Sequence, residues 1–180
     1  MKTLTLLRHA ESGWDDPALR DFDRPLNAKG KRAAAAVGRH WRSLGFEFDH
    51  VLASPAVRVA ETLEQVAGGY GSDLPATLDR RIYLASAVTL LDVVRELPDS
   101  VASALLVGHN PGLEDLVLML VPDNDQAPQR DAVEEKLPTA STVRLSFAID
   151  RWADAAANGA VLDLFVRPRD LDATLGPDLD

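Results

Sequence analysis

Short apolar runs alternate along the chain with longer stretches whose apolar positions follow a helical period. The short runs predict five strands, at residues 3–8, 50–53, 103–108, 141–149 and 160–166. The longer stretches predict four helices, at residues 28–44, 54–67, 86–97 and 110–120, and a further short helix is expected around Trp152. The polar segment 122–138 is predicted to be a long loop. This alternation indicates an α/β fold, a three-layer α/β/α sandwich with a mostly parallel open sheet and an antiparallel edge.

Local signals mark the ends of two of these helices. Ser54 suits the N-cap position, with Pro55 as the first helical residue, and Gly68-Gly69 is expected to end that helix. Asn110, which is followed by a proline, is the cap candidate of a later helix.

Composition limits the possible functions. With 180 residues and 46% hydrophobic residues, the chain fits a single domain, 1–180, in which 171–180 form an acidic surface tail. No apolar stretch approaches the roughly 20 residues of a membrane helix, so no membrane contact is expected and the predicted location is cytoplasmic. The absence of cysteine excludes disulfides and cysteine nucleophiles. A net charge of −9 argues against nucleic acid as a partner but leaves a small anionic group possible.

Basic side chains follow three of the predicted strands. The first strand ends in Arg8-His9, Arg58 lies in the first turn of the helix after the second strand, and His109 follows the third. Ligands of open α/β sheets bind beyond the carboxyl ends of the strands, so these side chains are expected to meet. Two arginines, two histidines and two helix N-termini suit a phosphate group, with one histidine as a nucleophile.

Each of these motifs also has a simpler interpretation. Arg8-His9 alone is typical of a salt bridge at a strand end. The segment 108–112 alone fits a strand-to-helix turn, and Arg58 alone fits a solvated helix. Only their ordered combination favours a functional site.

Three segments carry a resemblance to a known family. They are "LLRHAES", "ASPAVRVAETL" and "LLVGHNPGLEDLV". In order and spacing they resemble the motifs of the histidine phosphatase superfamily, which includes the phosphoglycerate mutases. The segment "SGWDDPALRDFDRPLNAKGKRAA" is similar to the SixA-type phosphohistidine phosphatase branch. The resemblance covers residues 2–171, and it implies a phosphoglycerate mutase-like fold and an enzyme that uses neither a metal nor another cofactor.

The resemblance also implies a role for seven residues. His9 would be the nucleophile that becomes phosphorylated. The groups that bind and neutralise the phosphoryl oxygens would be Arg8, Arg58 and His109. Further hydrogen bonds would come from Ser12, Asn110 and the backbone near Ala10.

The chain departs from the family pattern at three positions. Ala10 replaces the common glycine, and Glu61 replaces a glutamine and is expected to be able to pair with Arg58. Asn110 stands where many superfamily phosphatases carry an aspartate that acts as general acid. In the region where mutases carry a glutamate acid, Asp79 is the only carboxylate. The general acid is therefore missing or relocated.

The loop after the predicted nucleophile carries several acidic residues and Trp14. Its aspartates are expected to be solvated, with Asp23 pairing with Arg24 or capping the next helix, although one of them facing the substrate is the alternative. The candidates for a relocated acid are Asp15, Asp16, Asp21, Asp23 and Asp79. Trp14 is expected either at the pocket rim or in a packing role.

The distances between the motifs leave no room for a large cap domain, so the pocket is expected to be shallow and open. Such a pocket favours a phosphoryl group presented by a protein over an enclosed sugar phosphate. The sequence therefore predicts a metal-independent phosphatase that acts on phosphohistidine of a signalling or phosphotransfer protein. Two alternatives stay open, a phosphatase for small phosphate esters and a non-catalytic phosphate-binding module. A monomer is compatible with the sequence.

Overall fold

The computed structural model describes residues 1–124 and 128–177. The described strands are β1 (Lys2–Arg8), β2 (His50–Ala53), β3 (Thr77–Leu78), β4 (Ser103–Gly108), β5 (Thr142–Phe147) and β6 (Ala160–Val166). The α-helices are α1 (Ala28–Ser43), α2 (Val57–Tyr70), α3 (Ala87–Arg95), α4 (Gly112–Leu120), α5 (Pro128–Glu135) and α6 (Pro168–Leu171). Single 3₁₀ turns are η1 (Asp21–Asp23), η2 (Arg80–Ile82), η3 (Trp152–Asp154) and η4 (Ala173–Leu175).

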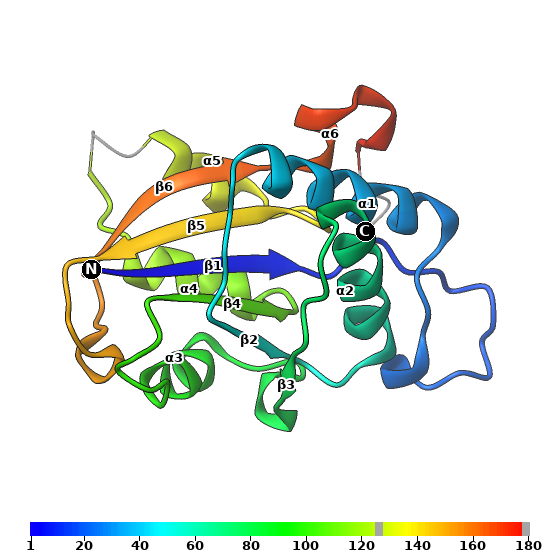
Figure 1. Cartoon of the computed structure of the whole chain (residues 1–180). Coiled ribbons are helices and arrows are strands. Elements are labelled where there is room, and N and C mark those ends of the chain that lie inside the picture. The colour runs from blue at the N-terminus through cyan, green and yellow to red at the C-terminus, as the bar shows by residue number, and fades with distance from the viewer. Residues whose placement is uncertain (125–127, 178–180) are drawn as a thin grey trace.

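The strands form one sheet in the order β3-β2-β4-β1-β5-β6 (Figure 1). The strands β1, β4, β2 and β3 run parallel, whereas β5 is antiparallel to both β1 and β6. The central strands β1 and β4 are buried along most of their length, which explains why their sequences are continuous apolar runs. The predicted open, mostly parallel sheet with antiparallel pairing at one edge is confirmed.

Helices cover both faces of the sheet, which confirms the three-layer arrangement. Helices α1, α2 and α6 pack together on one face, and α3, α4 and α5 pack on the other (Figure 1). Each layer contains a fully buried tryptophan whose indole N–H is satisfied. Trp41 donates to the Thr142 hydroxyl at 3.0 Å, and Trp152 donates to the Val101 carbonyl at 2.8 Å. Among the described residues, no helix is both long enough and apolar enough to cross a membrane.

The helix predicted at 54–67 differs from expectation at both ends. It begins at Val57 with Ala56 at the cap position, so Ser54 lies too early to cap it. The Ser54 hydroxyl accepts from the Ala56 N–H at 3.3 Å and lies 2.7 Å from a ring nitrogen of His109. At the other end it runs past the two glycines to Tyr70 and stops at Gly71, whose φ of +85° is left-handed. Glycine did not end the helix earlier because α2 packs closely on α1 at this point.

Three other segments correct the sequence prediction. The segment 122–138, expected to be a loop, contains α5. Its residues 125–127 lie outside the described residues. Buried Arg130 ties α5 to α4 by donating to the carbonyls of Val121 and Leu118 at 2.9 and 3.0 Å. The two-residue strand β3 was not predicted. The expected surface tail begins with ordered turns, and Leu175 is buried there.

The adjacent glycines of α2 have different environments, which gives a matched stability test. A Cβ at Gly69 would lie 2.1 Å from the Ala35 carbonyl oxygen of α1, whereas one at Gly68 would meet nothing within 4 Å. We expect Gly69→Ala to lower the free energy of unfolding by about 1–3 kcal/mol through overpacking. Gly68→Ala is expected to raise it by about 0.5–1 kcal/mol, because alanine favours a helix. Urea unfolding of both variants measures the difference, and equal effects would contradict the close packing.

Candidate active site

The carboxyl ends of three adjacent parallel strands bring the predicted residues together. The His9 N–H donates to the Gly108 carbonyl at 3.0 Å, which places His9 beside the end of β4. The Ser54 N–H donates to the Val107 carbonyl at 3.1 Å, which places the start of the α2 segment on the other side. A pocket of about 360 Å³ opens here, bordered by Arg8, His9, Ser12, Arg58, His109 and Asn110. Six of the seven predicted site residues therefore surround one pocket.

Hydrogen bonding fixes which nitrogen of His9 carries the lone pair. His9 Nδ1 lies 2.8 Å from the Ala10 carbonyl oxygen, which can only accept, so Nδ1 carries the proton. The lone pair is therefore on Nε2. Burial lowers the pKa of His9 well below its usual value, the bond to Ala10 opposes this, and the charge of Arg8 reinforces it. His9 is neutral at pH 7 and can act as a nucleophile without losing a proton.

Ala10 does not offer its amide to the pocket as expected. Its side chain is fully buried and its N–H donates to the Thr62 hydroxyl at 2.9 Å. The same hydroxyl donates to the Arg58 carbonyl at 2.6 Å. Ala10 therefore links the loop after β1 to α2, and its contribution to the site is the carbonyl that orients His9.

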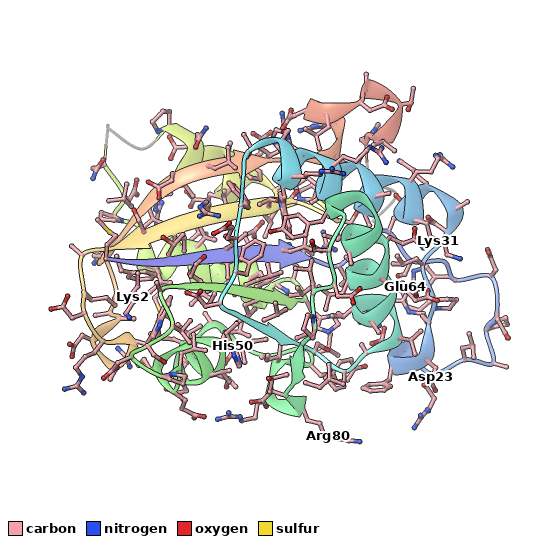
Figure 2. All side chains as sticks on the ribbon, viewed as in Figure 1. Lys2, Asp23, Lys31, His50, Glu64 and Arg80 are labelled. Atoms are coloured by element: carbon pink, nitrogen blue, oxygen red, sulfur yellow. The ribbon has the colours of Figure 1, made fainter. Side chains whose placement is uncertain are left out.

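The guanidinium of Arg58 is buried and ion-paired. The side chain is 2% exposed. Its Nη1 donates to the Asp21 carbonyl at 2.7 Å, and its Nη2 lies 3.0 Å from the Asp21 carboxylate. Asp21 belongs to η1, in the loop between β1 and α1 that extends beyond the carboxyl end of β1 (Figure 1). Figure 2 labels Asp23 on this loop, far from Lys2 at the amino end of β1. The loop therefore supplies the counter-charge for Arg58.

Asp21 is a residue for which the sequence favoured solvation. Besides Arg58, it accepts from Arg24 at 3.0 and 3.2 Å and from the Tyr83 hydroxyl at 2.6 Å. Burial opposes ionisation, but the hydrogen bond from Tyr83 and the charge of Arg58 outweigh it and lower the pKa of Asp21 to about 2. Asp21 is therefore a permanent carboxylate and cannot donate a proton at pH 7.

Two predicted ion pairs are wrong. Glu61 does not pair with Arg58, because its Oε1 accepts from the Leu26 N–H at 2.8 Å. Asp23 does not pair with Arg24, because it pairs with Arg20 at 2.8 Å, and Arg24 turns to Asp21. Asp21 is instead the carboxylate that pairs with both Arg58 and Arg24, each at 3.0 Å.

His109 is held between Arg58 and Ser54. Arg58 Nη2 lies 3.3 Å from His109 Nδ1, and an arginine can only donate, so the proton of the neutral ring is on Nε2, 2.7 Å from the Ser54 hydroxyl. Burial, followed by the charge of Arg58, lowers the pKa of His109 to about 3. In the free site His109 is therefore a neutral ring. The resemblance implied that Arg8, Arg58 and His109 together neutralise the phosphoryl oxygens, but of these three only the arginines carry positive charge in the free site.

Leu137 contributes a backbone carbonyl that the sequence did not reveal. Arg8 Nη1 and Asn110 Nδ2 both donate to this oxygen at 3.0 Å. The Leu137 N–H donates to Glu114 of α4 at 3.0 Å. The end of the segment 122–138 therefore lies against the site, and a backbone carbonyl has no side-chain signature that could have predicted this.

The pocket rim carries Trp14, as one of the two sequence interpretations held. Arg24 lies 3.4 Å above the Trp14 ring and donates to the Ser12 hydroxyl at 2.8 Å. Trp14 is 71% exposed, and Leu84 on the same pocket is 55% exposed. The rim is therefore open to solvent, in agreement with the expected open pocket.

Comparisons with known proteins agree with this geometry. A profile of the Histidine phosphatase superfamily (branch 1) matches residues 4–83. An uncharacterized protein of Mycobacterium tuberculosis is 34% identical over 164 residues, which cover 91% of this chain and all of the relative. The solved structure of SixA from Nakamurella multipartitia, an inferred phosphohistidine phosphatase, is 31% identical, with a TM-score of 0.77 over 93% of this chain and 96% of that one. The chain belongs to the histidine phosphatase superfamily.

Within this superfamily the chain belongs to the SixA-type branch. An inferred SixA from Agrobacterium tumefaciens also matches, at 26% identity and a TM-score of 0.76 over 93% of this chain and 98% of that one. This histidine phosphatase is thus an enzyme of the phosphatase class, and its pocket lies where the sequence motifs placed it. The motifs revealed His9, Arg58 and His109, whereas Asp21 was only one of several acidic candidates.

The lowered pKa of His109 predicts a pH-dependent stability. In the unfolded chain the ring binds a proton below about pH 6.5, but in the folded enzyme it does so only near pH 3. The unfolded state therefore gains protons first, and stability is lost as the pH falls through this window. Between pH 7 and 5 we expect this residue to cost about 2 kcal/mol of unfolding free energy. Urea unfolding of His109→Asn should show a decrease in unfolding free energy from pH 7 to pH 5 that is smaller by this amount. The same decrease in the variant as in the wild type would contradict the buried neutral ring.

Proposed function

We propose that this enzyme removes phosphate from phosphohistidine of a protein, through a phosphohistidine formed on its own His9. The observation that carries the proposal is a neutral histidine with its lone pair on Nε2, in a pocket that buried Arg58 and half-buried Arg8 border, beside an amide rather than an acid. The inferred activity of the SixA relatives supports the same substrate class.

The reaction proceeds in two displacements. The guanidinium groups of Arg8 and Arg58 bind the phosphoryl oxygens and stabilise the charge that develops on them. His9 Nε2 attacks phosphorus, forming one P–N bond while the substrate's P–N bond breaks and its electron pair leaves on the substrate imidazole. Water then attacks phosphorylated His9, releasing inorganic phosphate and restoring the neutral ring. His9 needs no base in the first displacement because Nε2 carries no proton.

The leaving group explains why the pocket functions without a dedicated acid. A phosphoserine leaves as an alkoxide, which must be protonated as it departs. A phosphohistidine leaves as imidazole, whose reference pKa of about 6.5 lets the substrate ring carry the needed proton near neutral pH. Asn110 has no acidic proton, and Asp21 is ionised with a pKa of about 2. The pocket therefore suits the P–N bond.

A small-molecule phosphomonoesterase is the second candidate, and Asp15 favours it. This exposed carboxylate borders the pocket, where it is the remaining candidate for a relocated acid. Asp16, Asp23 and Asp79 do not border the pocket. A non-catalytic phosphate-binding module is less favoured, because binding alone does not require a histidine with a lone pair facing the ligand.

The phosphorylated intermediate can be trapped. We expect wild-type enzyme quenched during turnover of labelled substrate to carry acid-labile phosphate on His9, and His9→Ala to be inactive and unlabelled. Peptide mapping locates the label. His50→Ala, at the start of β2, is the matched control and should label normally. Label on a serine would refute the intermediate, and activity lost to a chelator and restored by a divalent metal would refute metal independence.

Substrate preference tests the missing acid. In matched protein contexts we expect kcat/KM to favour phosphohistidine over phosphoserine by about 10²–10⁴, the usual contribution of general acid catalysis. Asn110→Asp should narrow this ratio by accelerating the ester. An aspartate there would lie against the Leu137 carbonyl, now 3.0 Å from the amide, and this contact favours the protonated acid.

Asn110→Ala is the control for this variant, because it removes the contact with Leu137 without adding an acid. It should leave the ester slow. Equal wild-type rates on the two substrates would exclude the phosphohistidine preference, and loss of ester turnover in Asp15→Asn would then favour the second candidate.

A further inference from the structure

Trp14 differs from the other two tryptophans of the chain. Trp41 and Trp152 are fully buried, whereas Trp14 is 71% exposed. A large aromatic side chain left in water forgoes the hydrophobic stabilisation that burial would give, and exposed tryptophans are enriched where ligands or partners bind. Trp14 also borders the catalytic pocket, which makes its exposure relevant to the substrate.

The indole is held in place despite its exposure. Arg24 covers one face at 3.4 Å. The Arg24 guanidinium is itself fixed by hydrogen bonds to Asp21, to the Ser12 hydroxyl at 2.8 Å and to the Gly13 carbonyl at 3.4 Å. One face of the ring is therefore occupied by a fixed guanidinium, and the other is available to a ligand.

Trp14 lies where the leaving group of a bound substrate would project, and not where its phosphoryl group would bind. The phosphoryl-binding side chains lie on the pocket floor, where Arg58 is 2% and His9 7% exposed. Trp14 and Leu84 lie at the exposed rim. A substrate whose phosphorus lies beside His9 Nε2 must project its leaving group along the line of attack, away from His9 and toward this rim.

We infer that Trp14 recognises the leaving group, stacking its open indole face on the imidazole ring of the bound phosphohistidine. This inference rests on the proposed function, and it identifies Trp14 as the residue that distinguishes phosphohistidine from substrates whose leaving group has no ring. An imidazole bonded directly to phosphorus is a flat aromatic ring at the pocket mouth, whereas serine offers no ring. Before the P–N bond breaks, the substrate ring that carries this proton is also a cation, and indole faces attract cations.

Phosphoramidate provides the matched probe, because it has the same P–N bond and no ring. We expect Trp14→Ala to lower the ratio of kcat/KM for a phosphohistidine protein over that for phosphoramidate by about three- to tenfold, the usual range for one aromatic pair. Trp14→Phe should restore most of the ratio. Leu78→Ala, an exposed apolar residue that does not border the pocket, is the control and should keep the wild-type ratio.

Fluorescence gives a second measurement that does not depend on turnover. In His9→Ala protein, binding of the phosphohistidine protein should quench the emission of exposed Trp14, and the quench should vanish when Trp14→Phe is added. Phosphoramidate should not produce it.

The outcomes separate the two proposals. An unchanged ratio in Trp14→Ala would overturn the stacking. If kcat/KM fell equally on both substrates, Trp14 would act only by supporting Arg24. Failure of wild-type enzyme to hydrolyse the phosphohistidine protein at all would overturn the proposed function and this inference with it.

Discussion

The site depends on the burial of one positive charge, the guanidinium of Arg58. A buried cation is costly unless an anion and hydrogen bonds compensate it, and Asp21 provides both through its carbonyl and carboxylate. The low-dielectric surroundings that make this pairing necessary also hold His9 and His109 neutral. His9 is neutral chiefly because its own ring is buried, and the charges of Arg8 and Arg58 act in the same direction.

Compensation by Asp21 also connects the pocket floor to its rim. The same carboxylate accepts from Arg58 on the floor, from Tyr83 after η2, and from Arg24, which supports Trp14. His109 contacts the Arg58 guanidinium through Nδ1, and its Nε2 proton lies on the side of Ser54. The charge of Arg58, after burial, is therefore a cause of the neutral state of the ring.

The sequence was most informative where chemistry follows a strand directly. His9 and His109 come one residue after neighbouring strands, so the parallel pairing of β1 with β4 was enough to bring them together. Arg58 was found because side chains at the start of a helix lean back toward the strand ends. Its partner was not found, because Asp21 comes from an irregular loop whose path depends on hydrogen bonds to distant residues. The segment 122–138 hid α5 because that helix buries only Arg130 and Val133, which leaves hardly any periodic apolar signal.

The identity of residue 110 follows from the fold as much as from the chemistry. Asn110 donates to the Leu137 carbonyl through Nδ2 and accepts the Glu114 N–H through Oδ1, so it uses both ends of its amide. An ionised carboxylate at this position would lose the donor and oppose the Leu137 carbonyl oxygen. The carbonyl cannot simply move away, because Arg8 and the contact with Glu114 fix the same residue. The attachment of this segment to α4 therefore favours an amide at residue 110, the position at which the family resemblance led us to expect an acid. Under the proposed function, a pocket constrained in this way suits a leaving group that brings its own proton, which imidazole does and an alkoxide does not.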